Sequence, residues 1–149
     1  MPQIIGYTTG AFDLFHVGHL NLLRHARGMC DYLIAGVASD ELLLERKGRL
    51  PVIPIEERLE IVKNIVFVDE AVVESHSNRL DEWRDHPFDV FFKGDDWKGT
   101  PKGIEMERQF NSVGVQVIYF PYTAHTSSTL LRTTLDRISN DFQPQRIAQ

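Results

Sequence analysis

Short apolar runs alternate with amphipathic stretches along most of the chain, a pattern typical of a sheet whose strands are connected by helices. The runs that predict strands cover residues 4–7, 31–38, 67–73, 88–92 and 115–120. Apolar residues at helical spacing predict helices over residues 20–27, 40–46, 55–65, 80–85, 104–110 and 126–138. Strands that alternate with helices in this way predict a Rossmann-like α/β domain with a doubly wound, mostly parallel sheet.

These elements form a single predicted domain at residues 1–138, followed by a polar C-terminal tail at residues 139–149. Glycine and proline residues predict loops at 48–54 and 98–103. Doubly wound sheets bind ligands at the carboxyl ends of their strands, where the strand order reverses. Three segments that follow predicted strands are therefore candidate site segments: residues 8–19, 94–97 and 122–129.

The composition narrows the class of protein. The 149 residues are 42% hydrophobic and 25% charged, and the net charge of −5 argues against a general nucleic-acid-binding protein, which usually has a basic face. Positive charge is nevertheless gathered locally in the Arg-Lys-Gly-Arg segment at residues 46–49. No apolar run approaches the roughly 20 residues that span a bilayer, and the N-terminus lacks a signal-peptide pattern. The single cysteine, Cys30, is expected to be a small buried residue, and together these features predict a cytoplasmic protein.

The segment after the first strand carries the candidate chemistry. It contains neither a G-x-x-x-x-G-K-[ST] phosphate loop nor a G-x-G-x-x-G fingerprint, but it holds His16 and His19 at the start of a helix. A spacing of three puts both rings on one side, where they could donate to an α-phosphate held at the helix N-terminus. Gly18 between them would let a nucleotide approach the backbone. Two ordinary surface histidines or a metal site are the alternatives, although no third ligand has suitable spacing.

Residues 8–19 read T-T-G-x-F-D-L-x-H-x-G-H, and further blocks at 31–32, 39–41, 57–58, 68–70 and 89–97 accompany this motif. On these residues the chain resembles the HxGH cytidylyltransferases, and among them the bacterial glycerol-3-phosphate cytidylyltransferases, over residues 4–135. The bare H-x-G-H motif is shared with adenylyltransferases and class I aminoacyl-tRNA synthetases, so the combination of blocks carries the resemblance. It implies the Rossmann-like fold of the HxGH nucleotidyltransferase type.

The resemblance also implies roles for individual residues. His16 and His19 would be catalytic, together with the cations Lys47 and Arg58, and Lys47, Asp13 and Arg79 would bind the acceptor. The nucleotide would be bound by Thr9, Gly10, Ala11, Phe12, Asp13, Gly18, Arg49, Gly94, Asp95, Asp96, Trp97, Tyr122, Thr123, Thr126, Ser127, Ser128, Thr129 and Arg132. Because the basic segment aligns with an offset of one residue, Arg46 is an alternative to Lys47.

Several of these residues have a plainer interpretation. Residues 46–49 could be a solvated loop, and Arg58 could pair only with Glu57 or Asp69. Residues 95–96 could cap a turn, and the hydroxyls of residues 126–129 could only cap the last helix.

The closing segment departs from the family pattern R-T-x-G-I-S-T-T. Tyr122 replaces the leading arginine, and Arg132, one turn into the predicted last helix, is a candidate for the missing charge. The S-S-T-L-L-R pattern of residues 127–132 resembles the closing motif of several adenylyltransferases. The segment 98–114 is also several residues longer than in the glycerol-3-phosphate cytidylyltransferases, and both departures put the acceptor in question.

The reaction implied by the resemblance transfers CMP from CTP to a small phosphorylated alcohol, with glycerol 3-phosphate as the first choice. Mg²⁺ is expected to be carried by the nucleotide rather than by protein ligands. The expected partners are CTP, the phosphorylated alcohol and a second copy in a homodimer, with neither nucleic acid nor membrane. The alternatives are an adenylyltransferase that uses ATP and a non-catalytic nucleotide-binding regulatory protein.

Overall fold

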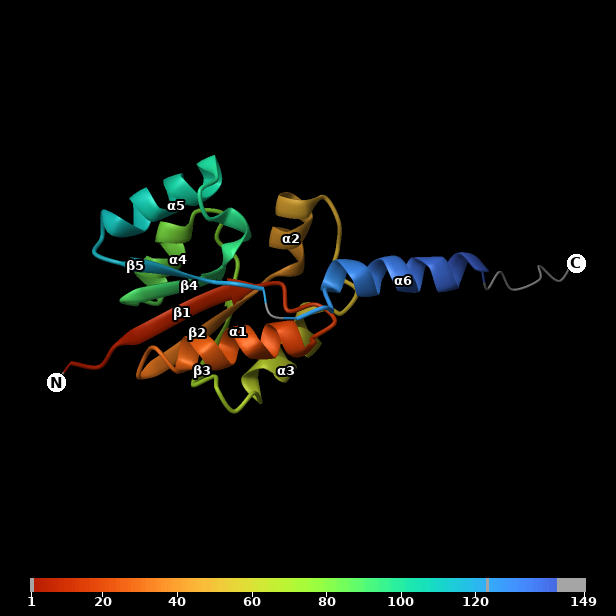
Figure 1. The fold of residues 1–149 in the computed structure, drawn as a ribbon, viewed down its shortest axis with the longest axis horizontal. Helices are drawn as coiled ribbons and strands as arrows, with labels where there is room; N and C mark the ends of the chain where they lie inside the picture. The colour runs from red at the N-terminus through yellow and green to blue at the C-terminus, as the bar shows by residue number, and fades with distance from the viewer. Residues whose placement is uncertain (1, 123, 142–149) are drawn as a thin grey trace, which may run out of the picture.

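The computed structural model describes residues 2–122 and 124–141 and contains, within them, a five-stranded parallel sheet in the order β3-β2-β1-β4-β5 (Figure 1). The strands are β1 (Ile5–Gly10), β2 (Tyr32–Ala38), β3 (Glu70–Glu74), β4 (Val90–Gly94) and β5 (Gln116–Phe120). The helices are α1 (Val17–Arg27), α2 (Asp40–Lys47), α3 (Ile55–Lys63), α4 (Arg79–Asp85), α5 (Pro101–Asn111) and α6 (Ser128–Asp141), with a 3-10 helix at Asp95–Trp97. The predicted Rossmann-like α/β fold is confirmed.

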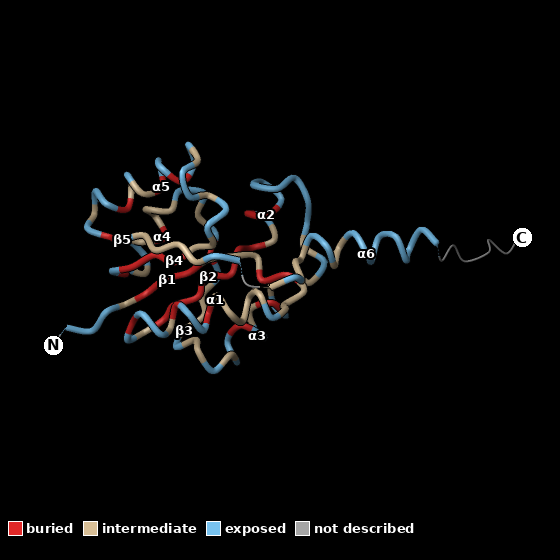
Figure 2. The backbone as a smooth tube through the Cα atoms, viewed as in Figure 1, coloured by how far each residue is buried: buried red, intermediate tan, exposed pale blue. Residues whose placement is uncertain are grey.

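Helices cover both faces of the sheet. In Figure 1, α4 and α5 lie above it, whereas α1 and α3 lie below it. Leu23 of α1 and Val62 of α3 share one core with Phe92, while Phe110 of α5 shares the other with Phe91. The neighbouring residues Phe91 and Phe92 enter opposite cores because successive side chains of a strand point to opposite faces. β2 is buried almost throughout, since strands flank it on both sides and helices cover both faces (Figure 2).

The position of the site follows from the strand order. β1 pairs with β2 on one side and with β4 on the other. The strands β2 and β3 therefore extend the sheet on one side of β1, and β4 and β5 extend it on the other, so the strand order reverses at β1. Ligands of such sheets bind outside the carboxyl ends of the strands at this reversal. The loops that leave β1 and β4 follow Gly10 and Gly94, which end these strands, and they contain most of the predicted site segments 8–19 and 94–97.

The first half of the chain differs from the predicted boundaries in two places. β1 continues to Gly10 rather than ending at Tyr7, because Thr8 and Thr9 stay in register with β2. Phe67 lies in a turn, Val68 lies outside any strand, and β3 begins only at Glu70.

The second half also differs in two places. α5 begins at Pro101, inside the predicted loop 98–103, because the Thr100 side chain accepts from the Gly103 N–H and proline fits the first helical turn. α6 continues to Asp141, past residue 138, and residues 142–149 of the predicted tail lie outside the described residues.

Two expectations from composition can be compared with the structure. Cys30 is buried, as predicted, and its thiol lies in the core beneath α1. Among the described residues, none of the helices combines the length and the apolar character that a membrane-spanning segment needs.

Candidate active site

His16 and His19 form a stacked pair at the N-terminus of α1. Their ring centroids lie 4.0 Å apart with 28° between the planes. His16 is the N-cap, where its Nδ1 accepts from the Gly18 N–H at 3.0 Å, and the His16 N–H donates to Nδ1 of His19 at 3.3 Å. The predicted placement of both rings on one side of the helix start is confirmed.

This reciprocal cap fixes the protonation of both rings. Because each Nδ1 accepts a backbone hydrogen bond, the proton of each neutral imidazole is on Nε2. Burial, followed by the nearby His16, lowers the pKa of His19 from its ordinary 6.5 to about 3, and burial also lowers the pKa of His16. Phe12 and Phe15 contribute to that burial, with ring centroids 5.5 and 5.3 Å from His19. Both histidines are therefore neutral hydrogen-bond donors at physiological pH.

Gly18 has a second reason to be glycine besides access for a ligand. A Cβ at this position would lie 2.7 Å from Cε1 of His16 and 3.4 Å from Cβ of Ala124. Any larger residue would push the His16 ring out of its capping position.

Asp13 organises the loop between β1 and α1. Its buried carboxylate accepts from the Val52 N–H at 2.8 Å and the Ile53 N–H at 2.9 Å, and these bonds hold its pKa below the ordinary value although burial opposes them. The residues on either side, Phe12 and Leu14, both have positive φ angles of 51° and 52°. Because non-glycine residues rarely adopt this conformation, the loop is held by tertiary contacts. Asp13 was predicted to bind substrate, and the structure places its carboxylate oxygens on the backbone.

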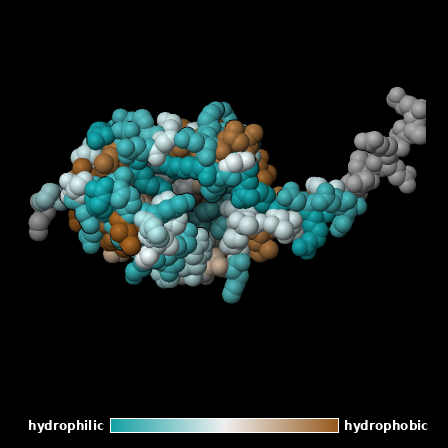
Figure 3. Space-filling view, turned by 90° about the horizontal axis from the view of Figure 1, so that it is seen from above, coloured by the Kyte–Doolittle hydropathy of each residue, from teal (hydrophilic) through white to brown (hydrophobic). Residues whose placement is uncertain are grey.

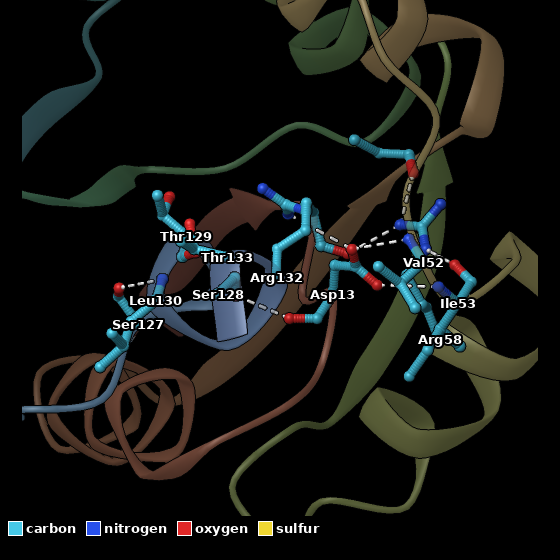
Figure 4. A network of polar contacts seen from close by, with 12 residues as sticks. Asp13, Val52, Ile53, Arg58, Ser127, Ser128, Thr129, Leu130, Arg132 and Thr133 are labelled. Atoms are coloured by element: carbon cyan, nitrogen blue, oxygen red, sulfur yellow. Dashed lines mark hydrogen bonds and ion pairs between the residues drawn. The ribbon is translucent and has the colours of Figure 1, made fainter. Parts of the chain in front are cut away.

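The start of α6 meets this loop, although the two are more than 100 residues apart in sequence (Figure 4). The Ser128 hydroxyl donates to the carbonyl oxygen of Asp13 at 2.7 Å and lies 3.5 Å from Nε2 of His19. Ser127 caps the helix by accepting from the Leu130 N–H at 3.0 Å. The structure thus brings together two of the segments that the sequence singled out, residues 8–19 and 122–129.

Positive charge is concentrated beside this junction. Lys47, Arg49 and Arg132 line one pocket together with Asp13. Nη2 of Arg132 lies 3.4 Å from Oδ2 of Asp13, but its Nε and Nη1 are buried and have no partner among the described residues. Desolvation, Arg132 and Arg49 all lower the pKa of Lys47. Three cations with spare donors favour an anionic ligand such as a triphosphate.

Arg58 lies elsewhere. Its side chain is 0% exposed and donates to the carbonyl oxygens of Ile53, Ala11 and Ala38 and to the carboxylate of Asp40, at 2.6 to 2.8 Å. The guanidinium therefore binds backbone carbonyl oxygens at the ends of β1 and β2 and does not line the cationic pocket, in contrast to the predicted contact with phosphates. The alternative pairing with Glu57 or Asp69 is also not what the structure contains.

The segment after β4 forms the other side of the site. Gly94 precedes the 3-10 helix of Asp95, Asp96 and Trp97, and both aspartates are exposed. Tyr122 is 70% exposed and lies beside Gly94, with a ring carbon 3.6 Å from the position of a Cβ there.

Arg79 and a lysine that the sequence analysis missed lie against Trp97. The guanidinium of Arg79 lies 5.2 Å from the indole centroid, and Nζ of Lys93 lies 4.1 Å from it. Lys93 could have been noticed as a charged residue at the end of an otherwise apolar run.

The other predicted residues occupy several environments. Thr9 lies at the end of β1, and its buried hydroxyl has no partner in the described part of the chain. Phe12 is only 2% exposed and packs against His19 rather than lining an open pocket. Gly10 ends β1 and Ala11 follows it, whereas Thr126 precedes the Ser127 cap and Thr129 lies in the first turn of α6. Thr123 lies outside the described residues.

Comparisons with known proteins agree with this arrangement. The model of the cytidylyltransferase-like family matches residues 7–134. A glycerol-3-phosphate cytidylyltransferase of Bacillus spizizenii is 35% identical over 89% of this chain and 95% of its own length. An FAD synthase of Pyrococcus horikoshii is 34% identical over 89% of this chain and 90% of its own length. An ethanolamine-phosphate cytidylyltransferase of Arabidopsis thaliana is 38% identical over 66% of this chain, which corresponds to 24% of that protein.

A solved structure supports the fold independently. A lipopolysaccharide core biosynthesis protein of Thermoplasma volcanium superposes with a TM-score of 0.70 at 23% identity, over 84% of this chain and all of the other. Together, the reversed strand order, the capped histidine pair and the family match over residues 7–134 establish that this chain belongs to the cytidylyltransferase-like family of nucleotidyltransferases.

Proposed function

We propose that this chain transfers CMP from CTP to a small phosphorylated alcohol and releases pyrophosphate, with glycerol 3-phosphate as the first acceptor to test. The observation that carries the proposal is the pair of neutral imidazoles at the start of α1, each with its proton on Nε2, beside three cations with spare donors. The glycerol-3-phosphate cytidylyltransferases among the relatives support this acceptor class.

The proposed reaction is an in-line displacement. An oxygen of the acceptor phosphate attacks the α-phosphorus of CTP, the bond to the bridging β-phosphate oxygen breaks, and pyrophosphate leaves. A phosphate monoester has a second pKa of about 6, so the acceptor is mostly a dianion at neutral pH and needs no general base. The Nε2–H groups of His16 and His19 would stabilise the charge that develops on the α-phosphate oxygens.

The cationic pocket would hold the rest of the triphosphate. Lys47, Arg49 and Arg132 would bind the β- and γ-phosphates and orient the leaving pyrophosphate. We propose that Mg²⁺ enters on these phosphates, its common mode with nucleotides, and supplies further charge neutralisation there. The Asp13 carboxylate already accepts two backbone hydrogen bonds, which agrees with a metal held mainly by nucleotide oxygens and water.

The test is pyrophosphate release with Mg²⁺, in which CTP and ATP are crossed with glycerol 3-phosphate, ethanolamine phosphate, larger polyol phosphates and flavin mononucleotide. Activity with CTP and a phosphorylated alcohol is the expected result. His16→Ala and His19→Ala should each lower turnover by orders of magnitude while circular dichroism shows a folded chain. Near-normal turnover of either variant would refute the roles of the histidines.

A second candidate is an adenylyltransferase of the same fold. Arg132, which lines the pocket with Lys47 and Arg49, belongs to a sequence pattern that resembles adenylyltransferases, and FAD synthases are among the relatives. Activity with ATP alone would select this candidate. Nucleotide binding without pyrophosphate release from any pair would instead favour a non-catalytic regulatory protein.

We also propose that the chain forms a homodimer. α6 extends away from the body of the protein, and Leu130, Leu135 and Ile138 on it are exposed (Figure 1). A second copy could cover these apolar residues. Light scattering coupled to size-exclusion chromatography should give twice the mass of one chain, and a monomer at all concentrations would contradict the proposal.

A further inference from the structure

Three cationic side chains surround one indole at the carboxyl edge of the sheet. Nζ of Lys93 lies 4.1 Å from the centroid of the Trp97 ring, the guanidinium carbon of Arg79 lies 5.2 Å from it, and Nζ of Lys102 lies 5.8 Å from it. A single cation–π contact is favourable, but three cations around one ring repel one another. Such a cluster is most stable when an anion lies between its members.

Arg79 has an unused donor at this place. Its Nη1 is buried and has no hydrogen-bond partner among the described residues. The guanidinium also lies 5.5 Å from the Phe91 ring, and the buried carboxylate of Glu74 attracts it. Stacking and charge thus hold the guanidinium in place, while one buried N–H group is left without the acceptor that such groups normally have.

Lys93 is held in the same way. Its side chain is 19% exposed, and its nearest carboxylate oxygen, Oδ1 of Asp96, is 3.9 Å away. Desolvation lowers the pKa of Lys93, and Arg79, Lys47 and Arg46 add to this effect. The charges of four cations thus converge near the end of β4, and the carboxylate that faces Lys93 is too distant for a hydrogen bond.

Arg79 and Lys102 line an open pocket of about 450 Å³ between α4 and α5, and Lys93 lies beside it against Trp97. The lining also includes the polar side chains of Ser77, Asn78 and Gln109 and the carboxylate of Glu105, which accepts from Arg108. The surface seen from this side is largely hydrophilic and is hollowed near its middle (Figure 3). Polar groups of both hydrogen-bond types suit a hydroxyl-bearing ligand better than a flat apolar one.

Lys47 links this cluster of cations to the histidine pair. Its charge acts on His19 and also on Lys93, and its side chain lines the pocket that contains Arg49 and Arg132. An anion bound between Lys93 and Arg79 would therefore lie at the same carboxyl edge of the sheet as the histidine pair, as a phosphate that attacks the α-phosphorus must.

We propose that Lys93 binds the phosphate of the acceptor beside Trp97, together with Arg79, for which the family resemblance already implies acceptor binding, and that the polar pocket between α4 and α5 holds the acceptor's hydroxyl-bearing carbon chain. Lys93 in this role supplies a cation at the end of β4. It lies one residue before Gly94, which is beside Tyr122, the residue that stands where the family pattern has an arginine. The inference rests on the proposed transfer to a phosphorylated alcohol and adds a residue that determines acceptor binding. Acceptors with more hydroxylated carbons than glycerol 3-phosphate should fill the pocket better.

The test compares Lys93→Met with Lys93→Arg and with the control Lys63→Met on the exposed end of α3. Losing one charge-assisted hydrogen bond should raise the KM for glycerol 3-phosphate or a five-carbon polyol phosphate about 10-fold to 100-fold. The KM for CTP and the thermal midpoint should change little, Lys93→Arg should restore most of the acceptor affinity, and Lys63→Met should behave like the unmodified chain. An unchanged acceptor KM in Lys93→Met, with the unmodified chain active, would overturn the inference and leave the proposed function intact.

A binding measurement separates the two proposals if no pyrophosphate is released. Trp83→Phe leaves Trp97 as the only tryptophan, because the chain contains two. Inorganic phosphate should change the fluorescence of Trp97 in this variant, and the change should be lost when Lys93→Met is added. A saturable response lost with Lys93 would support the anion site even without catalysis, whereas equal responses, or none, would reject it.

Discussion

At the residue scale, the histidine pair shows how a helix cap can prepare two side chains for the catalytic role that we propose for them. Each ring uses Nδ1 to accept a backbone N–H and leaves Nε2–H for a ligand. The same burial that holds the His19 ring lowers its pKa to about 3. A neutral imidazole with its proton on Nε2 can donate to developing charge without first being protonated, and this tautomer is already set in the free protein.

The lowered pKa of His19 predicts how stability depends on pH. In the unfolded chain this imidazole binds a proton below about pH 6.5, but in the folded chain it stays neutral to about pH 3. The unfolded state therefore binds more protons than the folded state across this window. The contribution of His19 to the free energy of unfolding is fully present above pH 6.5 and falls as the pH decreases, by up to about 1.4 kcal/mol per pH unit. The free energy of unfolding can be measured by urea titration between pH 7 and pH 5 for the unmodified chain and for His19→Gln. Its slope against pH should be shallower for the variant. Equal slopes would contradict the assignment.

Two arginines near the site have opposite surroundings and should respond differently to the same change. Arg58 is fully buried with four partners, whereas Arg132 keeps two buried nitrogens without any. Arg58→Met should lower the free energy of unfolding by roughly 3–5 kcal/mol, because buried carbonyl oxygens and Asp40 lose their partner. Arg132→Met should leave stability nearly unchanged and raise the KM for CTP about 10-fold or more. Denaturant unfolding and steady-state kinetics on both variants measure this contrast, and a reversed order of effects would refute it.

The sequence alone could not distinguish these arginines. The spacing of His16 and His19 shows their common side because both residues belong to one helical turn. The partners of Arg58, by contrast, include Ala11 and Ala38, which lie 47 and 20 residues away. Whether a guanidinium faces a pocket or a set of carbonyl oxygens depends on tertiary packing that no local pattern records.

At the element scale, α6 is attached to the site by its first turn. Ser127 and Ser128 are neighbours in sequence, but their hydroxyls make different contacts. Ser127 caps α6, while Ser128 donates to the carbonyl oxygen of Asp13 and lies near Nε2 of His19. The exposed remainder of the helix lies away from the sheet (Figure 2). The first turn is therefore where the C-terminal segment can affect the chemistry.

Ser127→Ala and Ser128→Ala form a matched pair for this argument. Each change removes one hydrogen-bonded hydroxyl and should destabilise the chain by about 1 kcal/mol. Only Ser128→Ala should also lower kcat, by about 10-fold, because the loop of Asp13 and His19 loses its link to α6. Thermal unfolding and turnover of both variants are the measurements. Equal kcat values in the two variants would show that Ser128 is only a structural residue.

The elements themselves could be predicted largely from hydrophobic periodicity, and the errors fall where local chemistry outweighs it. Thr100 and Pro101 are a helix-start signal, but the glycines at 99 and 103 favour a loop interpretation. Gly103 is needed inside α5, because a Cβ there would overlap the backbone oxygen of Trp97. Close packing between two segments, rather than chain flexibility, explains this glycine.

At the scale of the whole molecule, positive charge is concentrated at one edge of a chain whose net charge is negative. The chain carries a net charge of −5, yet Lys47, Arg49, Arg79, Lys93 and Arg132 all lie around the carboxyl edge of the sheet. Anionic substrates are therefore repelled by the molecule at long range and attracted by the edge at short range. The parallel strand order creates this edge, because loops distant in sequence leave the sheet on the same side.

This distribution predicts how salt affects the enzyme. If attraction by the edge dominates, kcat/KM for CTP should fall several-fold as ionic strength rises from about 0.01 M to about 0.15 M, where the screening length shortens from about 30 Å to about 8 Å. The kcat value should change little, because in the proposed complex the bound phosphates would contact the cations directly. Sucrose at matched osmolality controls for general solvent effects and should leave kcat/KM nearly unchanged. A rise of kcat/KM with salt would mean that the net negative charge governs approach, and the basic edge would then act only after the nucleotide has entered the site.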